Sequence, residues 1–307
     1  MEIVILFVGF SIGLVLLVKG ADEMVSSAVQ IALKFKLPSS IIGATFIGFG
    51  TSAPELFAST GAALKGDLDL GIGNIVGSNI ANSLLVVAVL YLALPKDFSQ
   101  KIKLNQISPV WMAILTTVFV STYVLTNEFP FLLGAVLLIL VIYVIYKMIS
   151  TESVDEGELL GEEKNYIWVR GGLSLLATLY GSQLVVDNAV AIAELFGVSS
   201  LIIGSTIIAI GTSLPEVAGT ISAAKMRKPD IVFGNIFGSN LFNIGLVGAT
   251  AIMISPGEIS SVIDYQLFIM YFVSFIVIFL SRNVIKRNSL LGYLFIVAYI
   301  LFLVSLF

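Results

Sequence analysis

The chain has 307 residues, of which 58% are hydrophobic and only 12% charged, and its mean hydropathy is +1.04. A soluble domain carries about 25% charged residues, so the composition excludes a soluble globular protein and predicts an all-α membrane protein with many spans. The lack of cysteine and histidine excludes disulfides, thiolate nucleophiles and imidazole chemistry, and the net charge of −4 indicates no nucleic-acid partner.

Ten apolar segments are long enough to cross about 30 Å of hydrocarbon. The first has no basic region before it, so we interpret it as a retained helix rather than a signal peptide. The first and sixth are expected to continue as longer, tilted helices, because residues 21–36 and 182–197 keep the helical period. The ten segments lie near residues 3–20, 39–65, 70–94, 108–126, 130–148, 167–190, 200–225, 231–254, 265–281 and 289–307.

An internal repeat divides the chain into two halves. The stretch 39–82 aligns with 200–243 without a gap, and 21 of the 44 aligned positions are identical. Each half holds five predicted spans, and an odd number makes the second half enter the membrane from the opposite side. We therefore expect a first repeat at 1–149, an acidic cytoplasmic linker at 150–166 and a second, inverted repeat at 167–307.

The loops differ in charge between the two sides of the membrane. Fourteen basic residues fall on one side, one falls on the other, and Lys19 lies at the first helix. Because basic loops stay in the cytoplasm, both termini are predicted to be extracellular in a prokaryotic plasma membrane. The fourteen are Lys34, Lys36, Lys96, Lys101, Lys103, Lys147, Lys164, Arg170, Lys225, Arg227, Lys228, Arg282, Lys286 and Arg287, and the single one is Lys65.

Two carboxylates, Glu55 and Glu216, lie deep inside apolar spans at equivalent positions of the repeat. A carboxylate within a membrane is costly and indicates a functional site. Each ends the motif Gly-Thr-Ser-x-Pro-Glu, in which proline removes a backbone donor and glycine loosens the helix. The helices are therefore predicted to break near Gly50–Ser52 and Gly211–Ser213, which frees carbonyl oxygens at membrane depth.

Further oxygen-bearing side chains follow the same helical spacing. On each broken helix, a stripe of residues spaced four apart contains the glutamate. A second stripe with the same spacing lies on the next span, beside a Gly-x-x-x-Gly motif, which favours close helix packing. The second stripe is expected either to hold helices together or to complete an all-oxygen cation site, which suits Ca²⁺ and Na⁺. The stripes are Thr51, Glu55 and Ser59 with Thr212, Glu216 and Thr220, then Asn74, Ser78 and Asn82 with Asn235, Ser239 and Asn243.

The remaining acidic residues are interpreted as solvated groups. The linker 150–166 has the charge pattern of a disordered segment, and a regulatory cation site is the alternative. Asp22, Glu23, Asp187 and Glu194 have no acidic counterpart across the repeat, so a solvated or capping role is expected for them.

The stretches GATFIGFGTSAPE and GSTIIAIGTSLPE, each followed by GNIVGSNIAN or GNIFGSNLFN, resemble the two alpha-repeats of the calcium/cation antiporter superfamily, close to its sodium/calcium exchanger branch. The resemblance implies ten transmembrane helices in two inverted-topology repeats, with broken helices at the ion site. It implies no cofactor and no protein partner, only the lipid bilayer and the transported ions.

The resemblance also implies a set of ion ligands. Glu55 and Glu216 match the central Ca²⁺ ligands, assisted by the carbonyls of Thr51 and Thr212. One departure is Asn243, where sodium/calcium exchangers usually have aspartate, although the Gly-Thr-Ser tripeptide is unlike the one in proton-coupled relatives. The flanking Na⁺ positions would use the two glutamates, the carbonyls of Gly48 and Ala209, and the hydroxyls of Thr51, Thr212, Ser78 and Ser239. Ser52 and Ser213 match the motif serines of the family, and Asn82 and Asn243 match the positions nearest the middle site.

The leading hypothesis is an electrogenic antiporter that moves Ca²⁺ outward against Na⁺ by alternating access, with the first and sixth helices sliding along an eight-helix body. A proton-coupled antiporter for Ca²⁺ or other divalent cations is the alternative within this class. An intramembrane hydrolase is disfavoured because the chain has no histidine, cysteine or activated serine, so no enzyme is expected. An ion channel is disfavoured by the mirrored helix breaks.

Overall fold

The structure is a computed structural model that describes residues 2–101, 107–151, 166–197 and 209–306. The described chain is almost entirely helical and has four short strands. The long and short α-helices are α1 (Glu2–Lys34), α2 (Ser39–Ile42), α3 (Gly48–Thr51), α4 (Ala53–Leu64), α5 (Leu68–Ala81), α6 (Val87–Ala93), α7 (Ile107–Thr126), α8 (Phe131–Thr151), α9 (Ile167–Leu195), α11 (Ala209–Gly211), α12 (Leu214–Lys225), α13 (Pro229–Phe242), α14 (Ala249–Ile254), α15 (Asp264–Ser281) and α16 (Ser289–Val304). The π-turns are η1 (Gly43–Ile47), η2 (Asn82–Val86) and η5 (Asn243–Gly248), and η6 (Ser261–Ile263) is a 3₁₀ turn.

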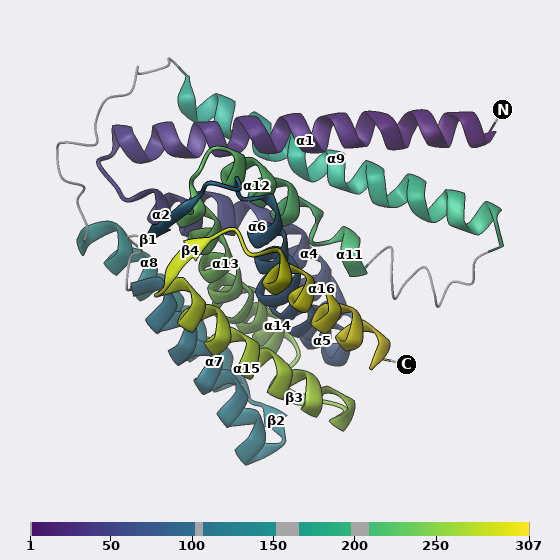
Figure 1. The fold of residues 1–307 in the computed structure, drawn as a ribbon. Coiled ribbons are helices and arrows are strands. Elements are labelled where there is room, and N and C mark those ends of the chain that lie inside the picture. Colours follow the sequence, from purple (N-terminus) through teal and green to yellow (C-terminus); the bar gives the residue numbers. More distant parts are fainter. Residues whose placement is uncertain (1, 102–106, 152–165, 198–208, 307) are drawn as a thin grey trace.

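Helices α1 and α9 lie side by side and run across one end of the other helices (Figure 1). The 33 residues of α1 rise about 50 Å, more than the hydrocarbon thickness, so the helix must tilt in a membrane. Small residues let the two backbones meet, since a Cβ added at Gly13 would lie 3.0 Å from the carbonyl oxygen of Gly181. An ion pair between Glu23 of α1 and Arg170 of α9 joins them further. The expected long first and sixth helices are thus confirmed.

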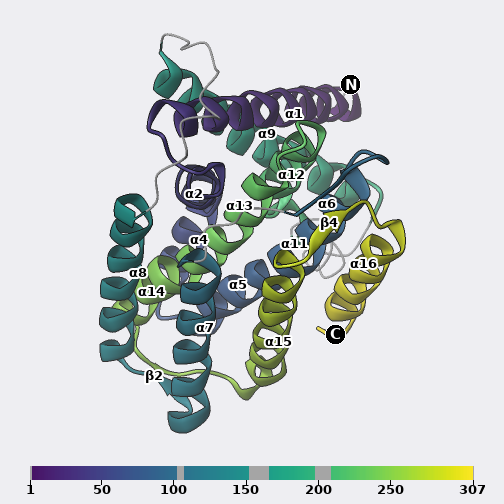
Figure 2. The same ribbon diagram turned by 60° about the vertical axis from the view of Figure 1, so that its left-hand side comes forward.

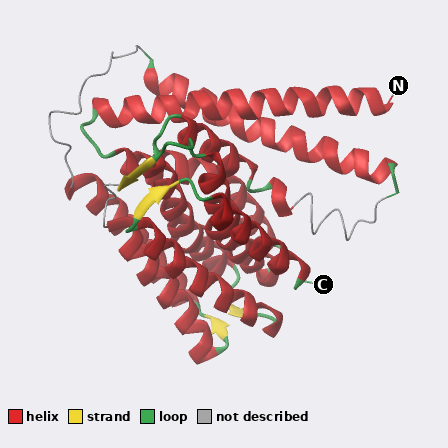
Figure 3. Ribbon diagram, viewed as in Figure 1, coloured by secondary structure: helices red, strands yellow, loops and turns green. Residues whose placement is uncertain are grey.

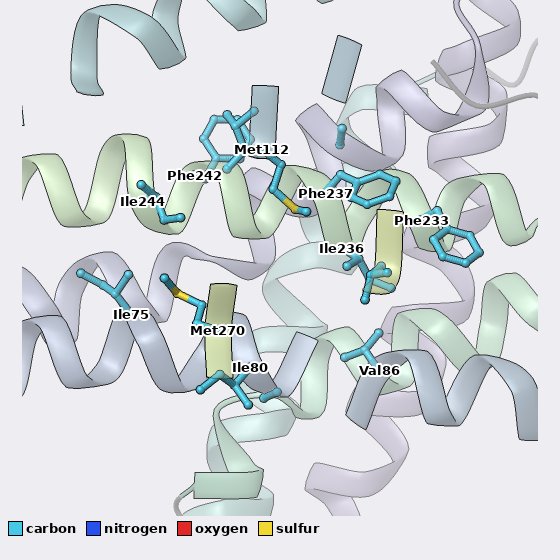
Figure 4. Packing of buried hydrophobic residues seen from close by; sticks show 14 of the residues in the cluster. Ile75, Ile80, Val86, Met112, Phe233, Ile236, Phe237, Phe242, Ile244 and Met270 are labelled. Atoms are coloured by element: carbon cyan, nitrogen blue, oxygen red, sulfur yellow. The ribbon is translucent and has the colours of Figure 1, made fainter. Parts of the chain in front are cut away.

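The remaining helices form a body around α13 and α5 (Figure 2). The apolar window in Pro229–Ile254 is 83% buried and that in Leu68–Ala93 is 78% buried, against 17% for α1. Phe233, Phe237 and Ile236 of α13 pack with Met112 and Met270 of the surrounding helices (Figure 4). The most buried spans are therefore those that follow the two Pro-Glu motifs of the repeat, which places them at the centre of the body.

Two short antiparallel strand pairs join loops from the two halves at opposite ends of α7 (Figures 1 and 3). β1 (Ser99–Lys101) pairs with β4 (Val284–Lys286), and β2 (Glu128–Phe129) pairs with β3 (Gly257–Glu258). Beside the first pair, Arg227 donates to Asp97 at 2.7 Å, and this hydrogen bond lowers the pKa of the Asp97 carboxyl below its ordinary value. The first strand pair thus lies among the basic loops and the second carries two acidic residues.

The described residues include seven helices that are long and apolar enough to cross a membrane, or eight if Ser39–Thr51 and Ala53–Leu64 count as one bent span. Ser289–Val304 is apolar but shorter, and the predicted span 200–225 begins outside the described residues. The mostly membrane-spanning helical fold is confirmed, while the number ten stays a prediction.

Of the two Gly-x-x-x-Gly motifs, the one in α13 makes close backbone contact. A Cβ added at Gly238 would collide with the backbone of Ala44, and one at Gly234 would collide with Ser40. Gly238→Ala should therefore destabilise the protein by about 1–3 kcal/mol, the usual cost of overpacking. The measurement is thermal unfolding in detergent, with Gly172→Ala as control because a Cβ added there would meet no atom within 4 Å outside its own turn of the helix. Equal melting temperatures would contradict the close packing.

Candidate cation site

Two helix breaks at equivalent positions of the repeat form the centre of the site. α3 ends at Thr51 and α4 begins at Ala53, with a bend of 45° between the two segments. In the second half α11 ends at Gly211 and α12 begins at Leu214. Proline stands in the first turn of both α4 and α12, where its missing N–H costs no hydrogen bond. The predicted breaks near Gly50–Ser52 and Gly211–Ser213 are confirmed.

Each break places a glutamate in the first turn of the helix that follows, where the positive end of the helix dipole faces its charge. The Glu55 side chain is 3% exposed and that of Glu216 is 2% exposed. Ser78 donates to Glu55 Oε1 at 3.4 Å, whereas the Oε2 atoms of both glutamates have no hydrogen-bond partner. The two carboxylates also lie close enough to act on each other electrostatically.

Neither glutamate is neutralised by a basic side chain in the described ion pairs, which involve Arg170 with Glu23 and Arg227 with Asp97. Two buried carboxylates without counter-charges are strongly destabilised in an apolar environment. No group of three or more acidic, histidine or cysteine side chains that could hold a metal ion occurs among the described residues. A cation that binds here would therefore take two charged oxygens and complete its shell with neutral ones.

Neutral oxygens from the opposite repeat lie beside the first break. The Thr51 hydroxyl lies 3.4 Å from that of Ser239 and donates to the Ile47 carbonyl at 3.1 Å. Ser239 also donates to the carbonyl of Gly48 at 3.3 Å. The structure thus brings together three of the predicted ligand residues, Thr51, Ser239 and Gly48, across the boundary between the halves.

Four asparagines link the two most buried spans in a reciprocal pattern. Asn82 Nδ2 donates to Asn240 Oδ1 at 3.1 Å, and Asn243 Nδ2 donates to Asn79 Oδ1 at 3.0 Å. Each of these two hydrogen bonds becomes the other when the aligned positions of the two halves are exchanged. Asn243 Oδ1 keeps no partner although the residue is only 1% exposed. The amides therefore hold the helices together, and one of them also presents a free buried oxygen.

Both central asparagines begin a π-turn, which the sequence analysis missed. η2 starts at Asn82 and η5 starts at Asn243, so the second span of each half changes its hydrogen-bond pattern at the same point. Such π-turns occur often at functional sites because they displace backbone groups from the regular ladder. The one signal in the sequence was the asparagine at equivalent positions.

The other predicted ligands lie at the same two breaks. Ser52 and Ser213 occupy the turns between the broken helices; both are buried, and the Ser52 hydroxyl has no partner. Thr212 lies in the turn between α11 and α12. Ala209 is the first residue of α11 and the first described residue after 198–208. The breaks therefore gather these residues beside the two glutamates.

A cavity of about 400 Å³ lies along α9 and reaches the second break. The Ser182 hydroxyl donates to the Gly211 carbonyl at 3.1 Å within its lining. Two of the acids that are expected to be solvated make side-chain contacts. Asp187 accepts a hydrogen bond from Gln183 at 2.6 Å within the lining of the cavity, and Glu23 forms the ion pair described above. The lining residues are Pro54, Leu179, Ser182, Gln183, Val186, Asp187, Val190, Ala191, Glu194, Gly211, Thr212 and Pro215.

Known proteins are similar to this chain in sequence and in fold along nearly its whole length. The family model described as Sodium/calcium exchanger protein matches residues 5–151 and 166–307. Sodium/calcium exchanger MaX1 of Methanosarcina acetivorans is 32% identical, over 96% of this chain and 97% of its own. Inner membrane protein YrbG of Escherichia coli is 31% identical, over 89% and 88%. A structure of the sodium-calcium exchanger NCX_Mj soaked with Na⁺ and Sr²⁺ covers 99% of both chains at 28% identity, with a TM-score of 0.83.

Proposed function

This chain belongs to the sodium/calcium exchanger protein family, and from that premise we propose that it moves Ca²⁺ outward in exchange for inward Na⁺ by alternating access. The family consists of ion exchangers, so the chain is a membrane transporter and not an enzyme. The observation that carries the proposal is the pair of buried carboxylates, each with an oxygen that no protein group satisfies. Ca²⁺ takes 6–8 oxygen ligands, usually with carboxylates among them.

The proposed ligand set joins both repeats. Glu55 and Glu216 hold Ca²⁺ at the centre, and the hydroxyls and carbonyls beside the helix breaks serve the Na⁺ positions. The contacts of Ser78 with Glu55 and of Ser239 with Thr51 and Gly48 support this set. The full set is Glu55, Glu216, Thr51, Thr212, Ser78, Ser239, Asn82, Asn243, Gly48, Ala209, Ser52 and Ser213.

We also propose ten spans in two inverted repeats, 1–149 and 167–307, joined by the linker 150–166, of which residues 152–165 lie outside the described part. The family model matches in two stretches that flank this linker. The pattern of the strand pairs supports the inversion. When the alignment of 39–82 with 200–243 is continued along the chain, the loop of β1 aligns with the loop of β3 and the loop of β2 aligns with the loop of β4. The pair β1 and β4 therefore corresponds to the pair β3 and β2.

In this proposal the two long helices α1 and α9 slide across the body as the site changes sides. The cavity along α9 is then the path to the extracellular side, since the acidic end of α9 carries no basic loop. A cell membrane location in a prokaryote agrees with the printed name of the E. coli relative, an inner membrane protein.

Cysteine labelling tests the orientation in this cysteine-free chain. A cysteine in place of Ser153, in the linker outside the described residues, should stay unlabelled when an impermeant maleimide is added to intact cells. A cysteine in place of Glu258, an exposed residue of β3, should react under the same conditions, because the two positions lie on opposite sides of the proposed topology. The reverse pattern would place the termini in the cytoplasm.

The function itself is tested by ⁴⁵Ca²⁺ uptake into proteoliposomes with Na⁺ and H⁺ gradients imposed separately. Uptake should follow an outward Na⁺ gradient across the vesicle membrane and ignore a pH gradient alone. Uptake driven by pH alone would favour the proton-coupled alternative, for which Asn243 in place of the family's usual aspartate is the specific observation.

A further inference from the structure

Asn74 and Asn235 occupy equivalent positions of the repeat, but they make different contacts. Asn74 Nδ2 donates to the Ser59 hydroxyl at 3.0 Å, and that hydroxyl donates to the Gly71 carbonyl at 3.0 Å. Asn235 instead turns its Oδ1 to the hydroxyls of Thr51 at 3.5 Å and Ser239 at 3.4 Å. The two halves therefore differ at a pair of identical residues.

The difference leaves a buried hydroxyl without a partner in the second half. Thr220 is the counterpart of Ser59, is 1% exposed, and has no hydrogen-bond partner for its Oγ1 atom. A buried hydroxyl in this condition destabilises the conformation that contains it. The first half shows that an asparagine at the position of Asn235 can supply the missing partner, because Asn74 does so for Ser59.

Access also differs along the second half. The cavity along α9 reaches Thr212, whereas α1 covers the part of α12 around Thr220. Met24 of α1 is fully buried there, and its methyl group lies 3.4 Å from a Cβ added at Gly219. The unpartnered Thr220 hydroxyl thus lies on the part of α12 that α1 covers.

We infer that Asn74 and Asn235 are positioning residues that exchange roles when the site changes sides, an inference that rests on the proposed antiport. In the conformation described, Asn235 Oδ1 is a second acceptor for the hydroxyls of Thr51 and Ser239, which also donate to the carbonyls of Ile47 and Gly48, so their oxygen lone pairs remain available to a cation. In the opposite conformation Asn235 donates to Thr220. Asn74 then no longer bonds Ser59 and instead orients the hydroxyls of Thr212 and Ser78. The proposed inverted repeat agrees with this exchange, because equivalent positions of the two halves trade environments when the site changes sides.

A matched pair of hydroxyl deletions tests the exchange without any transport measurement. Ala191 lines the cavity, so Ala191→Cys reports its opening through the rate of reaction with an impermeant maleimide. In that background Ser59→Ala removes a hydrogen bond of the described conformation and should slow labelling. Thr220→Val removes one that forms only in the opposite conformation and should speed labelling. Each change should shift the ratio of the two conformations by about fivefold, the effect of one net hydrogen bond.

Shifts in opposite directions support the inference, whereas equal rates or shifts in the same direction overturn it. Thr220→Val is expected to fold normally, because its hydroxyl has no partner to lose. If Ser59→Ala does not fold, Thr220→Val alone decides: faster labelling supports the inference, and an unchanged or slower rate overturns it.

Transport from each side provides the second measurement. Asn235→Ala should raise the KM for Ca²⁺ more on the side open in the described conformation, and Asn74→Ala should raise it more on the other side. A merely structural role would change both sides alike, and that result overturns the inference. A wild-type protein that does not exchange Ca²⁺ would instead contradict the proposed function, while the labelling result still decides the exchange of the two amides.

Discussion

Glu55→Gln and Glu216→Gln are each expected to reduce Ca²⁺ transport by about 100-fold or more. Glutamine keeps the shape of the side chain and removes one of the two charges of the proposed Ca²⁺ site. Removing one partner of a buried charge interaction costs about 3–5 kcal/mol, and each 1.4 kcal/mol is a factor of ten. One remaining carboxylate cannot neutralise a divalent cation that has lost its water. The measurement is ⁴⁵Ca²⁺ flux in proteoliposomes with equal amounts of protein.

The matched control is Glu258→Gln, which makes the same chemical change at an exposed residue of β3. That variant should keep the flux of the wild type. Both site variants should also fold, because neither Oε2 atom has a hydrogen bond to lose in the protein. Near-normal flux in either site variant would remove that glutamate from the ion site.

The second large effect concerns charge movement. With two carboxylates at the centre, the proposed site would be close to neutral with Ca²⁺ bound and would carry about one positive charge with three Na⁺ bound. Moving one charge across 100 mV is worth about 2.3 kcal/mol, so Na⁺-driven Ca²⁺ flux should respond strongly to voltage. A potassium gradient with valinomycin sets the potential, and ⁴⁵Ca²⁺ flux is measured at several values.

Proton coupling predicts a different outcome from the same carboxylates. Two protons also neutralise them, so exchange of Ca²⁺ for protons through Glu55 and Glu216 would be electroneutral. A flux that follows pH and ignores both Na⁺ and voltage would therefore establish the alternative. Asn243→Asp adds a third acid at the π-turn of η5, and it should alter Na⁺ affinity or pH dependence more than selectivity for Ca²⁺.

Much of the site was predictable because its causes are local. Pro54 and Pro215 break their helices through their own ring and missing N–H, so the breaks occur where the motifs predict them. Glu55 and Glu216 stand out because a carboxylate in an apolar span is costly wherever the chain folds. The gapless internal alignment pairs these positions without reference to any contact.

Other features depend on which groups meet after the helices pack. The residues of the two repeats are identical at Asn74 and Asn235, yet one amide bonds Ser59 and the other faces Thr51 and Ser239. A local pattern assigns both asparagines the same environment, because it contains no information on which side α1 covers. The π-turns at Asn82 and Asn243 likewise begin at residues whose amides contact a span of the opposite half of the chain. The repeated sequence thus predicts the symmetric chemistry of the site. The tertiary packing decides its asymmetry, because two identical side chains bond whichever groups pack nearest to them.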